Sequence, residues 1–202
     1  MIDFIAIFIY FFAVIDPIGT VPVFIAVTRH HSVQEKRKIA LMAFLMSAAI
    51  LVFFIVAGEL ILSAMNIPLS AFQVAGGIVL FLFAMQMIFG ESKPDQEVKL
   101  IKSEQETAIY PLAVPSIASP GAMLAAVLLT ENARYHVWEQ VQTGLTMLAV
   151  LLVVLVLMLA ASSVHRLIGN SGASIISRVM GLILASVATA NTMAGIKEYF
   201  VL

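Results

Sequence analysis

Asp16-Pro17-Ile18-Gly19 interrupts an apolar run that extends from residue 2 to residue 28. The run is long enough to cross a bilayer, which takes about 20 helical residues. Proline lacks a backbone N–H and disfavours helical geometry at the preceding residue, so we expect two half-helices, with Asp16 as N-cap and Pro17 as first residue of the second. Lipid cannot satisfy the backbone groups at such a break, and a carboxylate there is a candidate functional group. The alternative is a structural kink with a locally satisfied aspartate.

The composition of the chain indicates a polytopic membrane protein. Of 202 residues, 61% are hydrophobic and 11% charged, and the mean hydropathy is +1.04, whereas soluble domains carry roughly 25% charged residues. Eleven Lys and Arg against twelve Asp and Glu leave no basic excess for nucleic acid. The absence of cysteine excludes disulfides, thiolate metal sites and cysteine nucleophiles. The first apolar run lacks a basic n-region and is longer than the apolar core of a signal peptide, so we expect it to be retained.

Apolar segments near spanning length occur six times, at residues 2–28, 39–65, 68–89, 108–129, 141–164 and 175–196. A basic connection at residues 29–38 and a linker of mixed charge at residues 91–107 separate some of them. Nine of the eleven Lys and Arg residues fall on one side of this arrangement, and Arg134 and Lys197 fall on the other. The positive-inside rule makes the nine-residue side cytoplasmic, so we expect six crossings with both termini periplasmic.

The two halves of the chain resemble each other. The pattern Ile9-Tyr10-x-x-Ala13-Val14 recurs as Ile109-Tyr110-x-x-Ala113-Val114, and a proline and a glycine follow each copy, at Pro17 and Gly19 or at Pro120 and Gly121. Because each half has three segments, the second copy must enter the membrane in the opposite sense. Inverted repeats with broken helices are typical of secondary transporters, which bind substrate near the midplane.

The sequence therefore predicts an all-α membrane protein of six transmembrane helices arranged as two inverted three-helix repeats. The first repeat covers residues 1–90, a cytoplasmic linker covers residues 91–107, and the second repeat covers residues 108–202. The first and fourth helices are expected to be broken near the midplane.

The residues around both breaks also resemble the signatures of a known family. The run Asp16-Pro17-Ile18-Gly19-Thr20-Val21-Pro22-Val23-Phe24 is similar to the first signature of the MarC family of six-helix bacterial inner-membrane proteins, and Pro111-Leu112-Ala113-Val114-Pro115-Ser116-Ile117-Ala118-Ser119-Pro120-Gly121-Ala122 is similar to the second. The chain departs from the family at Ser119, where glycine is usual. The resemblance implies an integral inner-membrane protein related to transporters of small neutral amino acids such as glycine or alanine.

Each break is suited to ligand groups of one charge, either negative or positive. A helix N-terminus presents free amides and about half a positive charge, which suits a carboxylate, whereas the carbonyls that end a half-helix suit a cation. We expect the second break, at Ser119, Pro120, Gly121 and Ala122, to bind the substrate carboxylate. We expect the first break, at Asp16, Pro17, Ile18 and Gly19, to face an ammonium group, a sodium ion or a proton. An ordinary kink packed against a neighbouring helix is the alternative for the second break.

Other polar and small residues in the apolar segments have weaker signals. Gln86, Asn191 and Thr192 are candidates for residues that gate or line the path, and the alternative is hydrogen bonding between helices. Gly76, Gly77 and Gly181 are expected to let helices pack closely. All four histidines lie in connections or at segment ends, so we expect neither a metal site nor a cofactor.

The function that fits these features is secondary transport of a small neutral amino acid across the bacterial inner membrane, coupled to a proton or sodium gradient. An enzyme is not expected, because the apolar segments contain no cysteine, no midplane histidine and no HExxH motif. An exporter or channel for another small solute, or a non-transporting membrane scaffold, stays open. The expected partners are the lipid bilayer, the amino acid and the coupling ion, and the sequence does not specify an oligomeric state.

Overall fold

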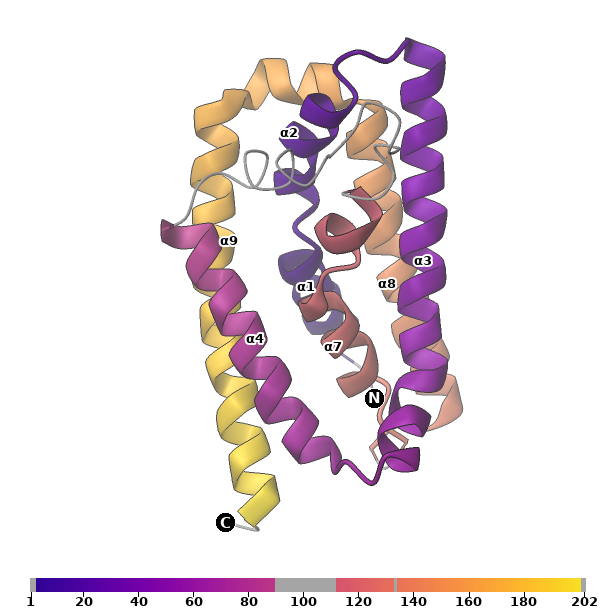
Figure 1. Cartoon of the computed structure of the whole chain (residues 1–202), viewed down its shortest axis with the longest axis vertical. Coiled ribbons are helices and arrows are strands. Elements are labelled where there is room, and N and C mark those ends of the chain that lie inside the picture. The colour runs from indigo at the N-terminus through magenta and orange to yellow at the C-terminus, as the bar shows by residue number, and fades with distance from the viewer. Residues whose placement is uncertain (1–2, 90–111, 133, 201–202) are drawn as a thin grey trace.

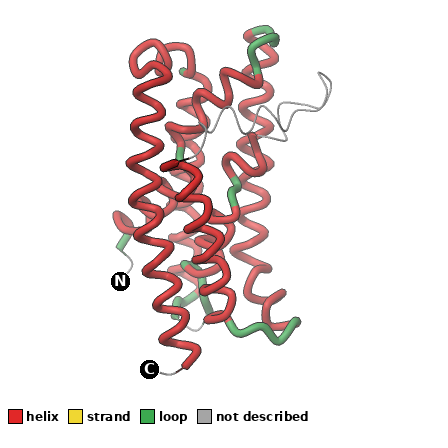
Figure 2. The backbone as a smooth tube through the Cα atoms, turned by 60° about the vertical axis from the view of Figure 1, so that its left-hand side comes forward, coloured by secondary structure: helices red, strands yellow, loops and turns green. Residues whose placement is uncertain are grey.

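The structure is a computed structural model that describes residues 3–89, 112–132 and 134–200. The regular elements within these ranges are all helices, which form an elongated bundle (Figure 1) with short connections between them (Figure 2). Five helical stretches are long and apolar enough to cross a membrane: Phe4–Val27, Val33–Ala64, Leu69–Phe89, Val137–Leu159 and Ser174–Phe200. The sequence predicted six. The linker at residues 91–107 and the first residues of the fourth predicted segment lie outside the described ranges.

The first segment consists of α1 (Phe4–Ile15) and α2 (Pro17–Val27). Asp3 begins α1 by accepting hydrogen bonds from the N–H groups of Ile5 and Ala6, each at 3.1 Å. Asp16 separates the two helices in a left-handed conformation, with φ 52° and ψ 67°. Non-glycine residues seldom adopt this conformation, although aspartate is among those that tolerate it best.

The third helix, α3 (Val33–Ala64), begins earlier than the hydropathy pattern predicted. The Ser32 side chain accepts from the Glu35 N–H, and the Glu35 carboxylate accepts from the Ser32 N–H at 2.7 Å, which is a capping box. Part of the basic connection predicted at residues 29–38 therefore belongs to the first turns of α3. The helix ends before a turn at Asn66, which has φ 55°.

The predicted fourth segment contains two short helices in its described part. These are η1 (Leu112–Ile117), a helical stretch that extended backbone interrupts at Val114, and α7 (Pro120–Leu128), and neither is long enough to span a bilayer. The chain continues into α8 (Val137–Leu159) and α9 (Ala161–Phe200), which bends at Gly169, where φ is 66°.

The helix α4 (Leu69–Phe89) packs along α9 over most of its length. Glycines allow the two backbones to approach: a Cβ atom on Gly77 would lie 3.0 Å from the Ala188 carbonyl oxygen, and one on Gly195 would lie 2.8 Å from the Ser70 carbonyl oxygen. A Cβ atom on Gly181 would similarly meet the Ala84 carbonyl oxygen at 3.2 Å. The expected close-packing role of Gly77 and Gly181 is confirmed, and Gly76 packs instead on Leu124 of α7.

The short helices of both broken segments fill the centre of the bundle. In Figure 1, α1, α2, η1 and α7 lie between the α3–α8 side and the α4–α9 side. Large side chains from both segments are fully buried there, among them Phe11, Ile15, Leu112 and Ile117. Asp16 and Ser119, which precede the two prolines, are buried in this interior, as polar groups at irregular backbone in a membrane require.

Candidate functional site

The first break is held by the backbone and side chain of Asp16. Pro17 has no N–H to give to the carbonyl of Ala13, so the hydrogen-bond ladder of α1 stops. Asp16 Oδ1 then accepts from the Gly19 N–H at 3.0 Å, and the Asp16 carbonyl accepts from the Thr20 hydroxyl at 3.0 Å. Asp16 is only 1% exposed. A carboxylate is thus fixed in the interior at the start of α2, as the sequence predicted for an N-cap.

Gly19 is required by the closeness of Asp16. A Cβ atom on Gly19 would lie 2.0 Å from Asp16 Oδ2 and 2.9 Å from the hydroxyl of Ser177 on α9. Real Cβ atoms do not come this close, so any larger residue would displace the Asp16 carboxylate or the Ser177 hydroxyl. The absence of a side chain at residue 19 therefore keeps Asp16 and α9 adjacent.

The second break is also capped by the residue before a proline, although Ser119 has an extended backbone where Asp16 is left-handed. Ser119 precedes Pro120 as Asp16 precedes Pro17, and its hydroxyl accepts from the Ala122 N–H at 3.2 Å. Ser119 is fully buried, whereas Pro120 is exposed. The Ala122 amide, which was expected to bind the substrate carboxylate, is thus capped by Ser119.

The structure brings the two breaks together. The Ser119 hydroxyl donates a hydrogen bond to the Val14 carbonyl in the last turn of α1, at 3.0 Å. A Cβ atom on Gly121 would lie 3.7 Å from Val14 Cβ and 2.2 Å from Leu80 Cδ1 of α4. The positive N-terminal end of α7 therefore lies beside the negative C-terminal end of α1.

The expected gate or lining residues lie on α4 and α9, and not on the helices that form the breaks. Gln86 is exposed on α4, and the half-buried Thr192 donates to the Ala188 carbonyl of its own helix at 2.9 Å. Asn191 donates to the Tyr10 hydroxyl at 2.6 Å, which ties α9 to α1. Asn191 thus takes part in hydrogen bonding between helices, which was its alternative role.

One residue near the first break was missed by the sequence analysis. The Ser177 hydroxyl of α9 donates to Asp16 Oδ2 at 3.5 Å. No sequence signal marked this residue, because a single serine within a membrane segment has no distinctive spacing. Its position follows only from the packing of α9 against α2.

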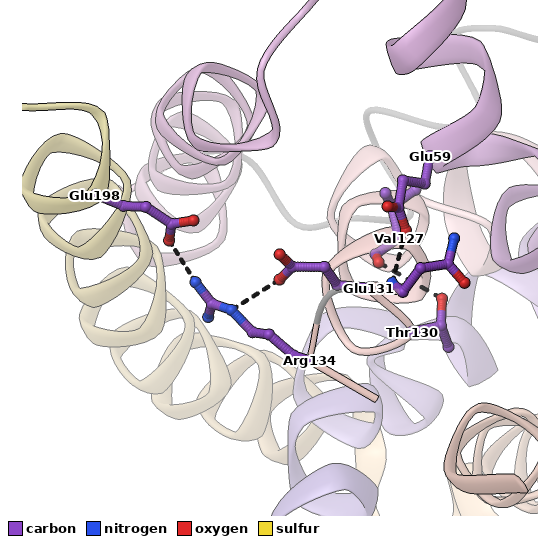
Figure 3. A network of polar contacts seen from close by, with 7 residues as sticks. Glu59, Val127, Thr130, Glu131, Arg134 and Glu198 are labelled. Carbon is purple, nitrogen blue, oxygen red and sulfur yellow. Dashed lines mark hydrogen bonds and ion pairs between the residues drawn. The ribbon is translucent and has the colours of Figure 1, made fainter. Parts of the chain in front are cut away.

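A separate polar network, seen from close by in Figure 3, joins the α7–α8 connection to α3 and α9. In Figure 1 this connection lies at the end of the bundle opposite the α2–α3 connection. Arg134, between α7 and α8, pairs with Glu131 at 2.9 Å and with Glu198 near the end of α9. Glu59 of α3 accepts from the Asn132 N–H at 2.8 Å. Burial raises the pKa of Glu131, Arg134 opposes this rise, and the charges of Glu198 and Glu59 add to it. Within the described ranges, no three His, Cys, Asp or Glu side chains are placed to hold a metal ion.

Comparison with known proteins gives consistent matches over nearly the whole chain. The model of a family described as "MarC family integral membrane protein" matches residues 1–200. The chain is 34% identical to a UPF0056 membrane protein of Buchnera aphidicola subsp. Schizaphis graminum, over 99% of this chain and 96% of that protein. It is 34% identical to a UPF0056 membrane protein of Methanocaldococcus jannaschii, over 96% of each chain. It is 31% identical to the UPF0056 inner membrane protein YhgN of Escherichia coli, over 92% of each chain. No solved structure matches significantly.

Proposed function

The chain belongs to the MarC family of integral membrane proteins, and from that premise we propose that it is a secondary transporter of a small neutral amino acid. It moves glycine or alanine across the bacterial inner membrane, coupled to a proton or sodium gradient, and it has no catalytic role. The substrate class is the one that the resemblance of its two signatures implies, and the inner membrane is the location in the printed name of the Escherichia coli relative.

The observation that carries this proposal is the bridge that Ser119 makes between the two breaks. Its hydroxyl accepts from the Ala122 N–H at the start of α7 and donates to the Val14 carbonyl at the end of α1. The carboxylate of an amino acid would accept from the same amide, and its ammonium would donate to the same carbonyl. A zwitterion therefore matches the two helix ends that Ser119 satisfies in this state.

The surroundings of the second break favour a small substrate. Ile117, Ala118 and Ala122 are fully buried, and Leu80 lies against Gly121. A side chain larger than that of alanine or serine would have to displace these groups from a closely packed interior. Glycine, alanine and serine are therefore the expected ligands, whereas leucine, phenylalanine and charged amino acids are not.

The architecture we propose for transport is six crossings in two inverted repeats, residues 1–90 and 108–202, with the breaks near the midplane. Three packing relationships support it. Helix α4, last in the first half, packs on α9, last in the second half. Helix α3 packs on α8, and the break in the first segment meets the break in the fourth. Elements at corresponding positions thus pair across the bundle, as a two-fold relationship requires.

Uptake into proteoliposomes tests the proposed function. Labelled glycine, alanine, serine, leucine, phenylalanine, lysine and glutamate are each supplied with an imposed sodium gradient, an imposed proton gradient or no gradient. We expect saturable accumulation of the first three amino acids, driven by one of the two gradients. Absence of saturable uptake under every gradient would contradict the proposal, and a current that does not saturate with solute would favour the alternative of a channel.

A further inference from the structure

The two oxygens of the Asp16 carboxylate have different surroundings. Oδ1 accepts from the Gly19 N–H at 3.0 Å and so belongs to the cap of α2. Oδ2 faces α9, where the Ser177 hydroxyl lies 3.5 Å away. A hydroxyl oxygen and a carboxylate oxygen at this separation can both contact one small ion placed between them.

The last turn of α1 directly precedes Asp16, and its carbonyls lose their usual helical donors at the break. Pro17 has no N–H for the Ala13 carbonyl. The Gly19 N–H, which an unbroken helix would give to the Ile15 carbonyl, is given to Asp16 Oδ1 instead. These carbonyls lie at the end of a helix, where the dipole places about half a negative charge and favours a cation.

We propose that Ser177 and Asp16, together with carbonyl oxygens at the end of α1, form a sodium site, so that the coupling ion is sodium. This inference rests on the proposed function and names its ion. The ligand set consists of oxygen atoms only, which hard cations prefer, and it holds one carboxylate, which suits a monovalent ion. Carbonyls at the end of a broken helix hold sodium in other secondary transporters.

The site also gives sodium a means of acting on the bundle. Ser177 is on α9, which packs along α4, whereas Asp16 is between α1 and α2. An ion bound between these side chains attracts the α4–α9 pair toward the broken segment. Sodium binding is then coupled to the position of the α4–α9 pair relative to the broken first segment, where the proposed substrate binds.

Thermal unfolding of the purified protein, without any amino acid, tests the site directly. Sodium chloride is titrated against potassium chloride and choline chloride at constant ionic strength. A ligand that binds only the folded state raises Tm along a saturation curve. We expect sodium, and neither potassium nor choline, to raise Tm in this way. Equal Tm values in all three salts would overturn the proposed site.

Two substitutions on α9 separate the role of Ser177 from general effects on the helix. Ser177→Ala removes the hydroxyl, and we expect the sodium concentration at half-saturation to rise about tenfold, the effect of losing about 1.4 kcal/mol. Ser186→Ala is the matched control, because the Ser186 hydroxyl is exposed and donates to the Leu182 carbonyl of its own helix. Ser177→Thr retains the hydroxyl and should restore the affinity for sodium. Equal half-saturation in the Ser177→Ala and Ser186→Ala proteins would remove Ser177 from the site.

Failure of the proposed sodium site can be distinguished from failure of the proposed transport function. Amino-acid uptake that follows a proton gradient and ignores sodium would overturn the sodium site and leave the proposed transporter intact. A sodium-specific rise in Tm, lost in Ser177→Ala, together with an absence of amino-acid uptake, would support the site and contradict the proposed transporter.

Discussion

Asp16 caps α2, and in the proposed sodium site it also supplies a negative charge; the geometry allows the two roles to be separated. The structural role is the hydrogen bond from the Gly19 N–H, which an asparagine oxygen accepts equally well. The proposed role of the charge depends on the second carboxylate oxygen, which faces Ser177. An Asp16→Asn protein therefore keeps the start of α2 and loses the charge.

We expect Asp16→Asn to reduce gradient-driven accumulation of glycine in proteoliposomes to the level of protein-free liposomes. The protein should still insert and give a symmetrical size-exclusion peak. Asp3→Asn is the matched control, because Asp3 also caps a helix, α1, but is exposed. Wild-type accumulation in Asp16→Asn would refute the charged role, and loss of folding would assign Asp16 to structure alone.

A substitution at Gly121 tests whether the second break binds the substrate carboxylate. A methyl group at this position would lie 2.2 Å from Leu80 Cδ1, and it would occupy the face of α7 that approaches Val14. We expect Gly121→Ala to weaken binding of glycine, alanine and serine together by about tenfold, which corresponds to losing one charge-assisted hydrogen bond. Isothermal titration of each amino acid measures the change.

Two controls make the Gly121 experiment specific. Gly144→Ala in α8 introduces a methyl group that meets only Ile55, at an ordinary 3.6 Å, and should leave affinity unchanged. Glycinamide, which lacks the carboxylate, should bind wild-type protein much more weakly than glycine. Equal affinity for glycine and glycinamide would remove the carboxylate from the mechanism and with it the assignment of the second break.

At the scale of helices, the α4–α9 interface depends on the absence of side chains. A Cβ atom on Gly195 would lie 2.8 Å from the Ser70 carbonyl oxygen, and backbone cannot move aside as a flexible side chain can. We expect Gly195→Ala to lower the free energy of unfolding by about 1–3 kcal/mol, the usual cost of overpacking. Gly144→Ala should instead stabilise α8 by up to about 1 kcal/mol, because alanine is the better helix former. Thermal unfolding in detergent compares the two, and equal shifts would contradict the close approach of α4 and α9.

The connection between α7 and α8 should make stability depend on pH through Glu131. Its pKa is raised above the ordinary value of 4.5, mainly by burial. Between 4.5 and the raised pKa, the folded protein binds more protons than the unfolded chain, so the free energy of unfolding falls as pH rises through this interval. Glu131→Gln cannot titrate, and its Tm should lack this fall. Measurement of Tm from pH 4 to pH 8 checks the prediction, and parallel curves for the two proteins would contradict it.

Sequence patterns predicted some helices well and others poorly, for identifiable reasons. Hydropathy and proline chemistry predicted helix ends at Asp16 and Ser119, where the N-caps lie in the structure. Hydropathy missed the start of α3, because the residues that begin it, Ser32 and Glu35, are polar. The contact between Ser119 and Val14, and that between Ser177 and Asp16, join residues more than 100 positions apart and depend on packing that no local pattern contains.

At the scale of the whole molecule, the ends of the bundle have different chemistry. The α2–α3 connection and the first turns of α3 carry Arg29, Lys36, Arg37 and Lys38, whereas the opposite end carries the network of Glu59, Glu131, Arg134 and Glu198. In Figure 1, α1 begins and α9 ends in the half of the bundle opposite the α2–α3 connection. From the positive-inside rule we therefore propose that the basic end is cytoplasmic and that both termini are periplasmic.

Two exposed histidines at opposite ends of the bundle allow this orientation to be tested. His30 lies in the α2–α3 connection, and His136 directly precedes α8. The chain has no native cysteine, so a cysteine introduced at either position is the only thiol. We expect His136→Cys to react with a membrane-impermeant maleimide in intact cells, and His30→Cys to react only after the membrane is permeabilised. The reverse pattern would invert the proposed orientation. The proposed six crossings require His30 and His136 to face opposite sides of the membrane. Labelling of both positions in intact cells would therefore contradict the six crossings.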